Sequence, residues 1–283
     1  MSGLAKAAYH GTPITPNTVL QALGFRDYCV SYYRPDQVEW IDANARSWFA
    51  DNGIFSAWMK GTEFSDAYWH DYYDFCRRWC LDGNCAWAVI PDPIGTGTQE
   101  LDYFIREWPA DLRDYGVPVY HLDEPIHRAV SLLERFGRLC VGATGEYRVI
   151  LSVAFCERMD ELFNAIHAAF GSIPPVHFFR GLQLLKPDCD WPITSADSTD
   201  IARNHNRLKS ISPLERSRRR IGDQAAEVAT LLEEMFGNRP EGSEHHLWAV
   251  QQAAGRWDAM AARRGTAWPP ARLSQRQLFG AAA

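Results

Sequence analysis

The chain has 283 residues, of which 46% are hydrophobic and 23% charged, and its formal net charge is −6. This composition is that of an ordinary globular protein and excludes a disordered or fibrous chain. No apolar run approaches the roughly 20 residues of a membrane helix, and the first residues lack the apolar segment of a secretory signal. We therefore expect a cytoplasmic protein. The seven cysteines, an odd number without a disulfide-scaffold pattern, indicate free thiols or a metal site rather than bridges.

Short runs rich in Val, Ile, Phe, Tyr and Trp alternate with segments of helical hydrophobic spacing, which is typical of repeated βα units. In chain order, strands are expected at residues 7–11, 28–32, 47–51, 87–92, 117–122, 139–143, 176–181 and 194–198. The clearest intervening helices are expected at residues 101–115, 126–136 and 156–170. Eight such strands predict an α/β fold of the (β/α)8 TIM-barrel type. A doubly wound open sheet is the alternative, although no G-x-G-x-x-G follows the first strand.

The chain changes character after Ser198. Residues 203–220 contain seven basic side chains and a single acidic one, and we call this segment the arginine strip. Helices are expected beyond it, at 223–236 and 246–263. We therefore expect a TIM-barrel domain over residues 1–204 and a basic, helical extension over residues 205–283 that packs on the barrel. A basic strip on an otherwise acidic chain suggests a polyanionic partner, and a solvated helix face is an equally good interpretation.

Polar residues stand at most of the predicted strand ends, where a parallel barrel places its active site. They are Asp51, Asp92, the segment from His121 to Glu124, the segment from Gly142 to Glu146, and Asp197. Each one alone is explained by a helix cap or a turn. Together, carboxylates that converge on one small mouth indicate acid–base or nucleophilic chemistry. Asp51 and Asp197 are the candidate pair for a retaining displacement at a sugar carbon.

Other chemistries lack their usual motifs. The H-x-H of many metal-dependent barrel hydrolases is missing from the first strand, and there is no G-x-S-x-G for a serine nucleophile. Four side chains offer a zinc site in principle, and they are His70, Cys76, Cys80 and Cys85. Their spacing is not that of a standard C-x2-C pair, so free thiols beside Trp79 and Trp87 are the favoured interpretation and no cofactor is expected. His245 and His246 are expected on the surface.

Five segments resemble those of the tRNA-guanine transglycosylase superfamily, in the same order along the chain. They are HGTPITP at 10–16, ADNGIFS at 50–56, VIPD at 89–92, VGATGE at 141–146 and SADSTDIARN at 195–204. The resemblance is greatest to the phage and bacterial branch that acts on DNA, the 7-deazaguanine DNA transglycosylases. It implies a pentosyltransferase that replaces guanine with a 7-deazaguanine, such as 7-cyano-7-deazaguanine, without breaking the backbone.

The resemblance also implies roles for single residues. Asp197 would attack C1′ of the nucleoside to give a covalent intermediate, and Asp51 would move protons. Asp92 would accept hydrogen bonds from the guanine edge, Phe55 would stack on the base, and Arg180 would cover the opposite face. The other expected substrate-binding residues are His121, where the family has a glutamine, and Gly142, Ala143 and Glu146 of the glycine-rich segment.

One departure from the family bears on the nucleic acid. Members that act on tRNA carry a zinc site of three cysteines and a histidine after the nucleophile, whereas this chain has no cysteine beyond Cys189. DNA is therefore the expected partner, and tRNA is the alternative. The expected nucleic-acid contacts are Arg203, Arg207, Lys209, Arg218, Arg219 and Arg220. A catalytically silent nucleic-acid-binding barrel and, less favoured, a metal-dependent hydrolase are the alternatives of another class, and a homodimer that supplies further contacts is left open.

Overall fold

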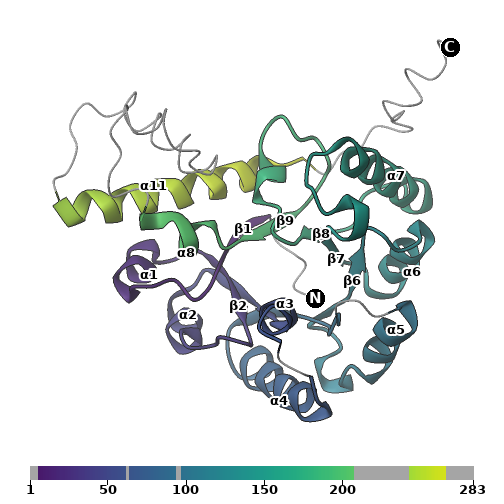
Figure 1. The fold of residues 1–283 in the computed structure, drawn as a ribbon, viewed down its shortest axis with the longest axis horizontal. Coiled ribbons are helices and arrows are strands. Elements are labelled where there is room, and N and C mark those ends of the chain that lie inside the picture. Colours follow the sequence, from purple (N-terminus) through teal and green to yellow (C-terminus); the bar gives the residue numbers. More distant parts are fainter. Residues whose placement is uncertain (1–5, 62–63, 94–96, 207–241, 266–283) are drawn as a thin grey trace.

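Nine parallel strands form one sheet that curls into a nearly closed barrel, with helices around it (Figure 1). The computed structural model describes residues 6–61, 64–93, 97–206 and 242–265. The strands are β1 (Ala7–Gly11), β2 (Asp27–Ser31), β3 (Ser47–Asp51), β4 (Cys85–Val89), β5 (Gly116–Val117), β6 (Val119–His121), β7 (Leu139–Gly142), β8 (Val176–Phe178) and β9 (Ser195–Ser198). Their order in the sheet is β5-β4-β3-β2-β1-β9-β8-β7-β6. The predicted TIM-barrel architecture is confirmed.

The fifth of the eight predicted strands is divided in two by Pro118. β5 pairs with β4, and β6 pairs with β7. Proline has no backbone N–H to give to a ladder, so the run expected at 117–122 breaks at this residue. The Pro118 carbonyl still accepts a hydrogen bond from Cys140 N at 2.9 Å. Because β5 and β6 are the two ends of the sheet and are joined through one residue, the chain itself closes the ring at this seam.

Most of the helices surround the barrel, whereas α3 lies over its centre in the view of Figure 1. The helices are α1 (Asn17–Leu23), α2 (Val38–Asn44), α3 (Ile54–Trp58), α4 (Asp66–Cys76), α5 (Thr98–Glu107), α6 (Ile126–Phe136), α7 (Val153–Phe170), α8 (Asp200–Asn204) and α11 (Gly242–Arg263). Shorter helical turns are η1 (Arg77–Leu81), η2 (Ala110–Leu112), η3 (Gly145–Tyr147) and η4 (Leu182–Leu185). The helix expected at 101–115 ends at Glu107, because the residue before Pro109 is disfavoured in the helical conformation. α7 begins earlier than expected, after Ser152, whose Oγ accepts a hydrogen bond from Phe155 N at 3.2 Å.

The barrel interior is filled by large rings. Tyr9, Phe49 and Trp87 are almost fully buried, and the rings of Phe49 and Trp87 stack with centroids 3.9 Å apart. Trp87 Nε1 also donates to Tyr9 Oη at 3.4 Å. Packing of this kind makes the lower barrel a solid core. The packed interior therefore holds the strand ends, and the side chains on them, in fixed positions.

The last described helix, α11, packs on α1 and β1 (Figure 1). Its buried face includes Ala249, Val250, Ala253, Ala254 and Trp257. Arg26, before β2, forms an ion pair with Asp258 of this helix. The expectation that His246 lies on the surface is wrong, because the side chain is buried and His246 Nε2 lies 2.9 Å from the carbonyl of His205. The helix expected at 223–236 lies outside the described residues.

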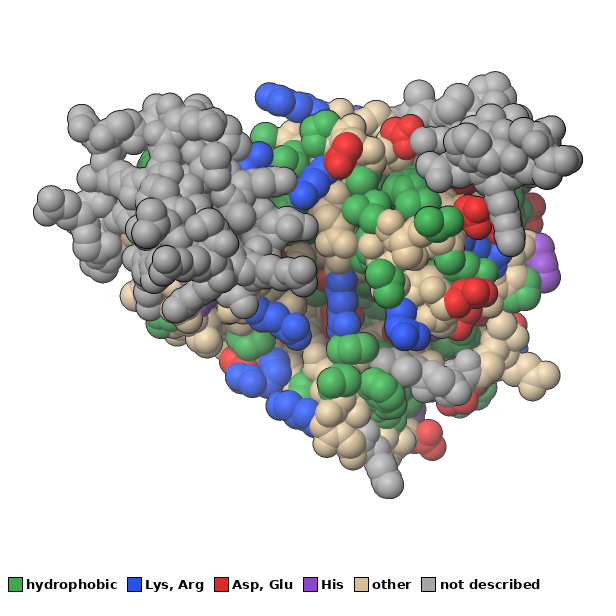
Figure 2. Space-filling view, turned by 45° about the horizontal axis from the view of Figure 1, so that its top comes forward, with side chains coloured by type: hydrophobic (Ala, Val, Ile, Leu, Met, Phe, Trp, Pro, Cys, Tyr) green, Lys and Arg blue, Asp and Glu red, His purple; other side chains and the backbone are tan. Residues whose placement is uncertain are grey.

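The charge is unevenly distributed over the surface. Figure 2 shows a face on which Lys and Arg side chains form a row from the centre toward the lower left, while Asp and Glu are more frequent toward the right. In the described part of the chain, none of the helices combines the length and the apolar character needed to cross a membrane.

Candidate active site

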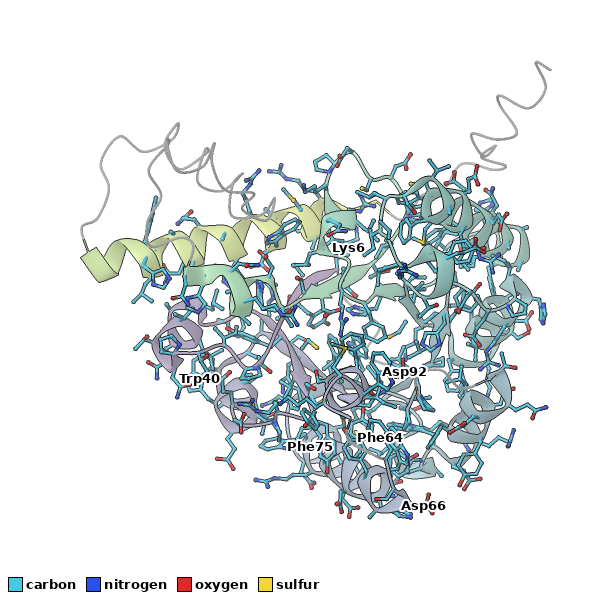
Figure 3. The ribbon with its side chains drawn as sticks, in the orientation of Figure 1. Lys6, Trp40, Phe64, Asp66, Phe75 and Asp92 are labelled. Carbon is cyan, nitrogen blue, oxygen red and sulfur yellow. The ribbon has the colours of Figure 1, made fainter. Side chains whose placement is uncertain are left out.

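The predicted polar residues meet at the carboxyl ends of the strands. Asp51 ends β3, His121 ends β6, Gly142 ends β7, and Asp197 lies near the end of β9. Asp92 follows β4 and is labelled in Figure 3, inside the belt of outer helices. Parallel strands bring all of these ends to one rim of the barrel. Asp92 and Asp197 both lie close enough to Asp51 for their charges to raise its pKa.

Asp92 is the centre of a hydrogen-bonded group of three side chains. Its Oδ1 accepts from Asn52 Nδ2 at 2.7 Å, and its Oδ2 lies 3.2 Å from His121 Nε2. Burial lowers the pKa of His121, but the hydrogen bond to Asp92 and the charges of Asp92 and the neighbouring acidic residues outweigh it, so that the pKa is raised. A carboxylate has about four acceptor positions. Asp92 therefore still has the capacity to accept two further N–H groups.

Two hydrogen bonds fix the orientation of Asn52, one with the backbone of Ile54 and one with Tyr68 of α4. Asn52 Oδ1 accepts from Ile54 N at 3.0 Å, and its carbonyl accepts from the Tyr68 hydroxyl at 2.7 Å. Gly53 follows with φ +76°, and a Cβ there would lie 2.6 Å from Tyr33 N. Only glycine fits this left-handed turn. The sequence analysis gave Asn52 no role of its own, although its position directly after Asp51 is a signal that could have found it.

Asp51 has the most perturbed carboxyl of the site. Burial, followed by the negative charges of Asp92 and Asp197, raises its pKa from 3.8 to about 7. A hydrogen bond from Gly53 N at 3.2 Å to Asp51 Oδ2 and the charge of Arg180 only partly oppose this. The side chain is half-buried, so it keeps contact with the solvent. A carboxyl whose pKa is near neutrality can both release and accept a proton, which suits general acid–base work.

Asp197 is buried, and its contacts engage one of its two oxygens. Oδ1 accepts from the backbone N of Arg180 at 2.8 Å and lies 3.4 Å from Nε2 of His177. Arg180 has φ 54°, in the left-handed region that a residue with a side chain rarely adopts. Such strain is tolerated where surrounding structure imposes it, and it is frequent at functional sites. In Arg180 this strained conformation accompanies the hydrogen bond from its backbone N–H to the Asp197 carboxylate.

Phe55 and Arg180 lie against each other over this region. The Arg180 guanidinium is 3.5 Å from the centroid of the Phe55 ring, which is direct contact. The two side chains were expected on opposite faces of a base, and in this structure no base-sized gap separates them. Both side chains are exposed, and a cation–π contact at an exposed site is worth only about 0.5–1 kcal/mol. A base that stacks on Phe55 would therefore displace Arg180 at little cost.

The glycine-rich segment divides into two parts. Gly142 adjoins the site, since a Cβ at this position would lie 3.2 Å from Cδ2 of His121, and Ala143 follows it, half-buried. Glu146 is exposed and lines a surface pocket together with Tyr147, Glu157, Arg158 and Glu161. Among the described residues no hydrogen bond joins Glu146 to Asp51, Asp92 or Asp197. The structure thus places Gly142 beside His121, the partner of Asp92, and places Glu146 at a surface pocket.

Of the expected nucleic-acid contacts, Arg203 is the one that the structure describes. It is exposed on α8, directly after the strand that carries Asp197. Arg207, Lys209, Arg218, Arg219 and Arg220 lie outside the described residues. Other exposed cations on loops after the strands include Arg34, Lys60, Arg148 and Arg180.

The cysteines of the possible zinc site are buried thiols. Cys76, Cys80 and Cys85 form no disulfide and are almost fully buried. Over the described ranges, no three or more His, Cys, Asp or Glu side chains are arranged so that they could hold a metal ion.

One buried residue of the site was missed at the sequence level. His177, in the middle of β8, contacts Asp197 from inside the barrel. A histidine flanked by Val176 and Phe178 looks like part of an apolar strand, and only the pairing of β8 with β9 brings it to Ser195 and Asp197.

No protein-family model and no curated protein matches this chain. Among solved structures, the chain is similar to the YdjI aldolase from Escherichia coli K12, with a TM-score of 0.36 and 10% sequence identity over 92% of each chain. A likeness of this extent says nothing about activity. The interpretation of the site therefore depends on its own geometry.

Proposed function

We propose that the protein is a base-exchange transglycosylase that replaces guanine in DNA with a 7-deazaguanine through a covalent aspartyl intermediate. The observation that carries the proposal is the difference between its two carboxyls. Burial and the charges of Asp92 and Asp197 raise the pKa of Asp51 to about 7. Asp197 is held through Oδ1 by a backbone N–H. A retaining displacement needs this division of work, because one carboxyl must attack while the other carries the proton.

The arrangement around Asp92 supports a guanine-like base as the leaving group. His121 and Asn52 hold both carboxylate oxygens by hydrogen bonds from the protein side. The remaining acceptor positions match the N1–H and exocyclic N–H of guanine, which lie side by side on one edge. Gly142 leaves room for close approach on the side of His121. These contacts would bind the base while Asp197 reacts at the sugar.

Two features favour DNA over the alternatives. The chain lacks the cysteines that a tRNA-type zinc site would need after the nucleophile, and the arginine strip supplies phosphate-binding groups in that part of the sequence. A silent nucleic-acid-binding barrel would gain nothing from three mutually repelling carboxylates. Repulsion within such a group weakens the fold, and groups of this kind are typical of sites whose chemistry requires them.

The decisive experiment is exchange of labelled guanine. The protein is incubated with duplex DNA or tRNA and radioactive guanine, which requires no knowledge of the natural base, and then with 7-cyano-7-deazaguanine followed by digestion to nucleosides and mass analysis. We expect label and the modified nucleoside in DNA, and neither with Asp197→Asn, whose amide is a poor nucleophile. Asp36→Asn, at an exposed aspartate paired with Arg34, is the matched control. Incorporation into tRNA alone would favour the tRNA enzyme, and no incorporation into either would overturn the proposal.

A further inference from the structure

His177 is a fully buried titratable side chain to which the reaction described above gives no role. It projects from β8 into the barrel, where the rings of Phe49 and Trp87 lie 5.0 and 5.1 Å from its own ring, centroid to centroid. Tyr9 lies at 5.7 Å. These three contacts are all edge-on or tilted, so they fix the plane of the imidazole. The direction of its two nitrogens is then set by polar neighbours.

Both polar neighbours of His177 belong to β9. Nδ1 lies 2.9 Å from Ser195 Oγ, and Nε2 lies 3.4 Å from Asp197 Oδ1. Ser195 and Asp197 are two residues apart in one strand, so their side chains share a face. Nε2 is buried and has no hydrogen-bond partner in the described structure, so its approach to Asp197 Oδ1 at 3.4 Å is an ion-pair contact without hydrogen-bond geometry. A buried N–H is strongly unfavourable without an acceptor, and the Asp197 oxygen is the acceptor at hand.

We infer that His177 is a positioning residue for the Asp197 nucleophile. Ser195 donates its hydroxyl hydrogen to Nδ1, which places the ring proton on Nε2, within ion-pair distance of Oδ1 of Asp197. The tautomer of a histidine is set in this way by the hydrogen bond of its other nitrogen. The inference rests on the proposed role of Asp197 as the attacking group.

This arrangement assigns different work to the two oxygens of Asp197. Oδ1 faces the backbone N–H of Arg180 and Nε2–H of His177, and Oδ2 is left to attack. As the bond from Oδ2 to C1′ forms, the bond from C1′ to N9 of guanine breaks, and its electron pair leaves with the base, which takes a proton from Asp51. Oδ1 becomes the carbonyl oxygen of the ester. The proton on Nε2 stays in place throughout, and the incoming base reverses the same steps.

The kinetic test uses two substitutions at one position. His177→Phe keeps a ring in the aromatic layer and removes both nitrogens, whereas His177→Gln keeps an N–H group that can reach Asp197. We expect His177→Phe to lower kcat for labelled-guanine exchange about 10–100-fold, the usual effect of removing an orienting partner, with KM changed less than about 3-fold. His177→Gln should recover part of the loss. Ser195→Ala should lie between the wild type and His177→Phe.

His10→Phe is the matched control for packing. His10 is also fully buried in a strand, and no hydrogen bond to its ring is found in the described structure. Since Tyr9 points into the barrel, the alternation of the strand points His10 to the outside. Per folded molecule, His10→Phe should exchange guanine at the wild-type rate. A wild-type kcat for His177→Phe, or a loss equal to that of His10→Phe, would overturn the positioning role.

A second measurement does not depend on exchange. In ¹⁵N-histidine spectra, the signals missing from His177→Phe identify this ring, and we expect Nδ1 without and Nε2 with a proton. Ser195→Ala should alter the Nδ1 signal and Asp197→Asn the Nε2 signal. A proton on Nδ1 in an enzyme that exchanges guanine would refute the positioning role of His177 and leave the proposed function standing. The expected tautomer in a protein that exchanges no base would support the contact and refute the proposed function instead.

Discussion

Replacing Asp51 by asparagine should stabilise the protein at alkaline pH. Burial, and then the charges of Asp92 and Asp197, raise the pKa of Asp51 from 3.8 to about 7. A carboxyl whose pKa is higher in the folded than in the unfolded state favours folding at low pH, and this contribution is lost as the pH rises through the folded pKa. Compared with Asp51→Asn, the wild type should therefore weaken between about pH 4 and pH 7.

The size of the effect follows from the shift. One pKa unit corresponds to about 1.4 kcal/mol, so a rise from 3.8 to about 7 corresponds to about 4 kcal/mol. Asp51 is half-buried, and its solvent contact screens part of this, which leaves about 2–3 kcal/mol. A domain of this kind has a total stability of about 5–15 kcal/mol. The difference is large enough to measure.

The assay is urea unfolding of the wild type, Asp51→Asn and Asp36→Asn at about pH 4 and about pH 8. Asp51→Asn should gain stability over the wild type only at the higher pH. Asp36, whose side chain is 57% exposed, serves as a carboxyl whose removal should have nearly the same effect at both values. If the free-energy difference between Asp51→Asn and the wild type is equal at the two pH values, Asp51 is an ordinary ionised carboxylate and the proton-transfer role fails.

Three further outcomes are expected. Asp92→Asn should weaken binding of a deazaguanine base about 10–100-fold by equilibrium binding, because hydrogen bonds to a carboxylate are worth about 1.5–3 kcal/mol, and unchanged affinity would exclude Asp92 from base recognition. Gly53→Ala should lower the unfolding free energy by at least about 1 kcal/mol, since φ is +76° and the added Cβ would lie 2.6 Å from Tyr33 N; unaltered stability would mean that the turn relaxes freely. Neutralising Arg218, Arg219 and Arg220 together should reduce the log–log salt dependence of duplex binding by nearly three, at about 0.9 per phosphate contact, and an unaltered slope would make the arginine strip a solvated surface.

The fold was accessible from the sequence because barrel strands have local signals. Apolar runs punctuated by turns identified all eight strand positions, and β1 and β3 have the expected bounds. Two of the errors fall at prolines. Pro118 splits one strand and Pro109 shortens one helix, effects that a hydrophobic pattern does not register. The aromatic helix α4 carries hydrophobic and polar residues in a pattern that the sequence analysis did not assign.

The candidate site was only partly accessible. Asp51, Asp92 and Asp197 could be singled out because a carboxylate after a strand stands on a known rim of a barrel. Contacts between strands could not be predicted, since they depend on register. The link from His177 to Ser195 and Asp197 is an example. The contact of Arg180 with Phe55 joins the segment after β8 to α3, and it depends in the same way on how distant segments meet. Burial of His246 against His205 likewise depends on how α11 docks.

The position of α11 constrains the order in which the chain can fold during synthesis. β1 pairs with β9, and α11 packs on both β1 and α1. β1 leaves the ribosome before β9 and α11, and its neighbours are complete only after both have followed. Until then the apolar residues under α11 stay exposed on a growing chain, and closing such long-range contacts is slow. A nascent chain of this protein should thus need protection by chaperones longer than one whose first elements fold locally.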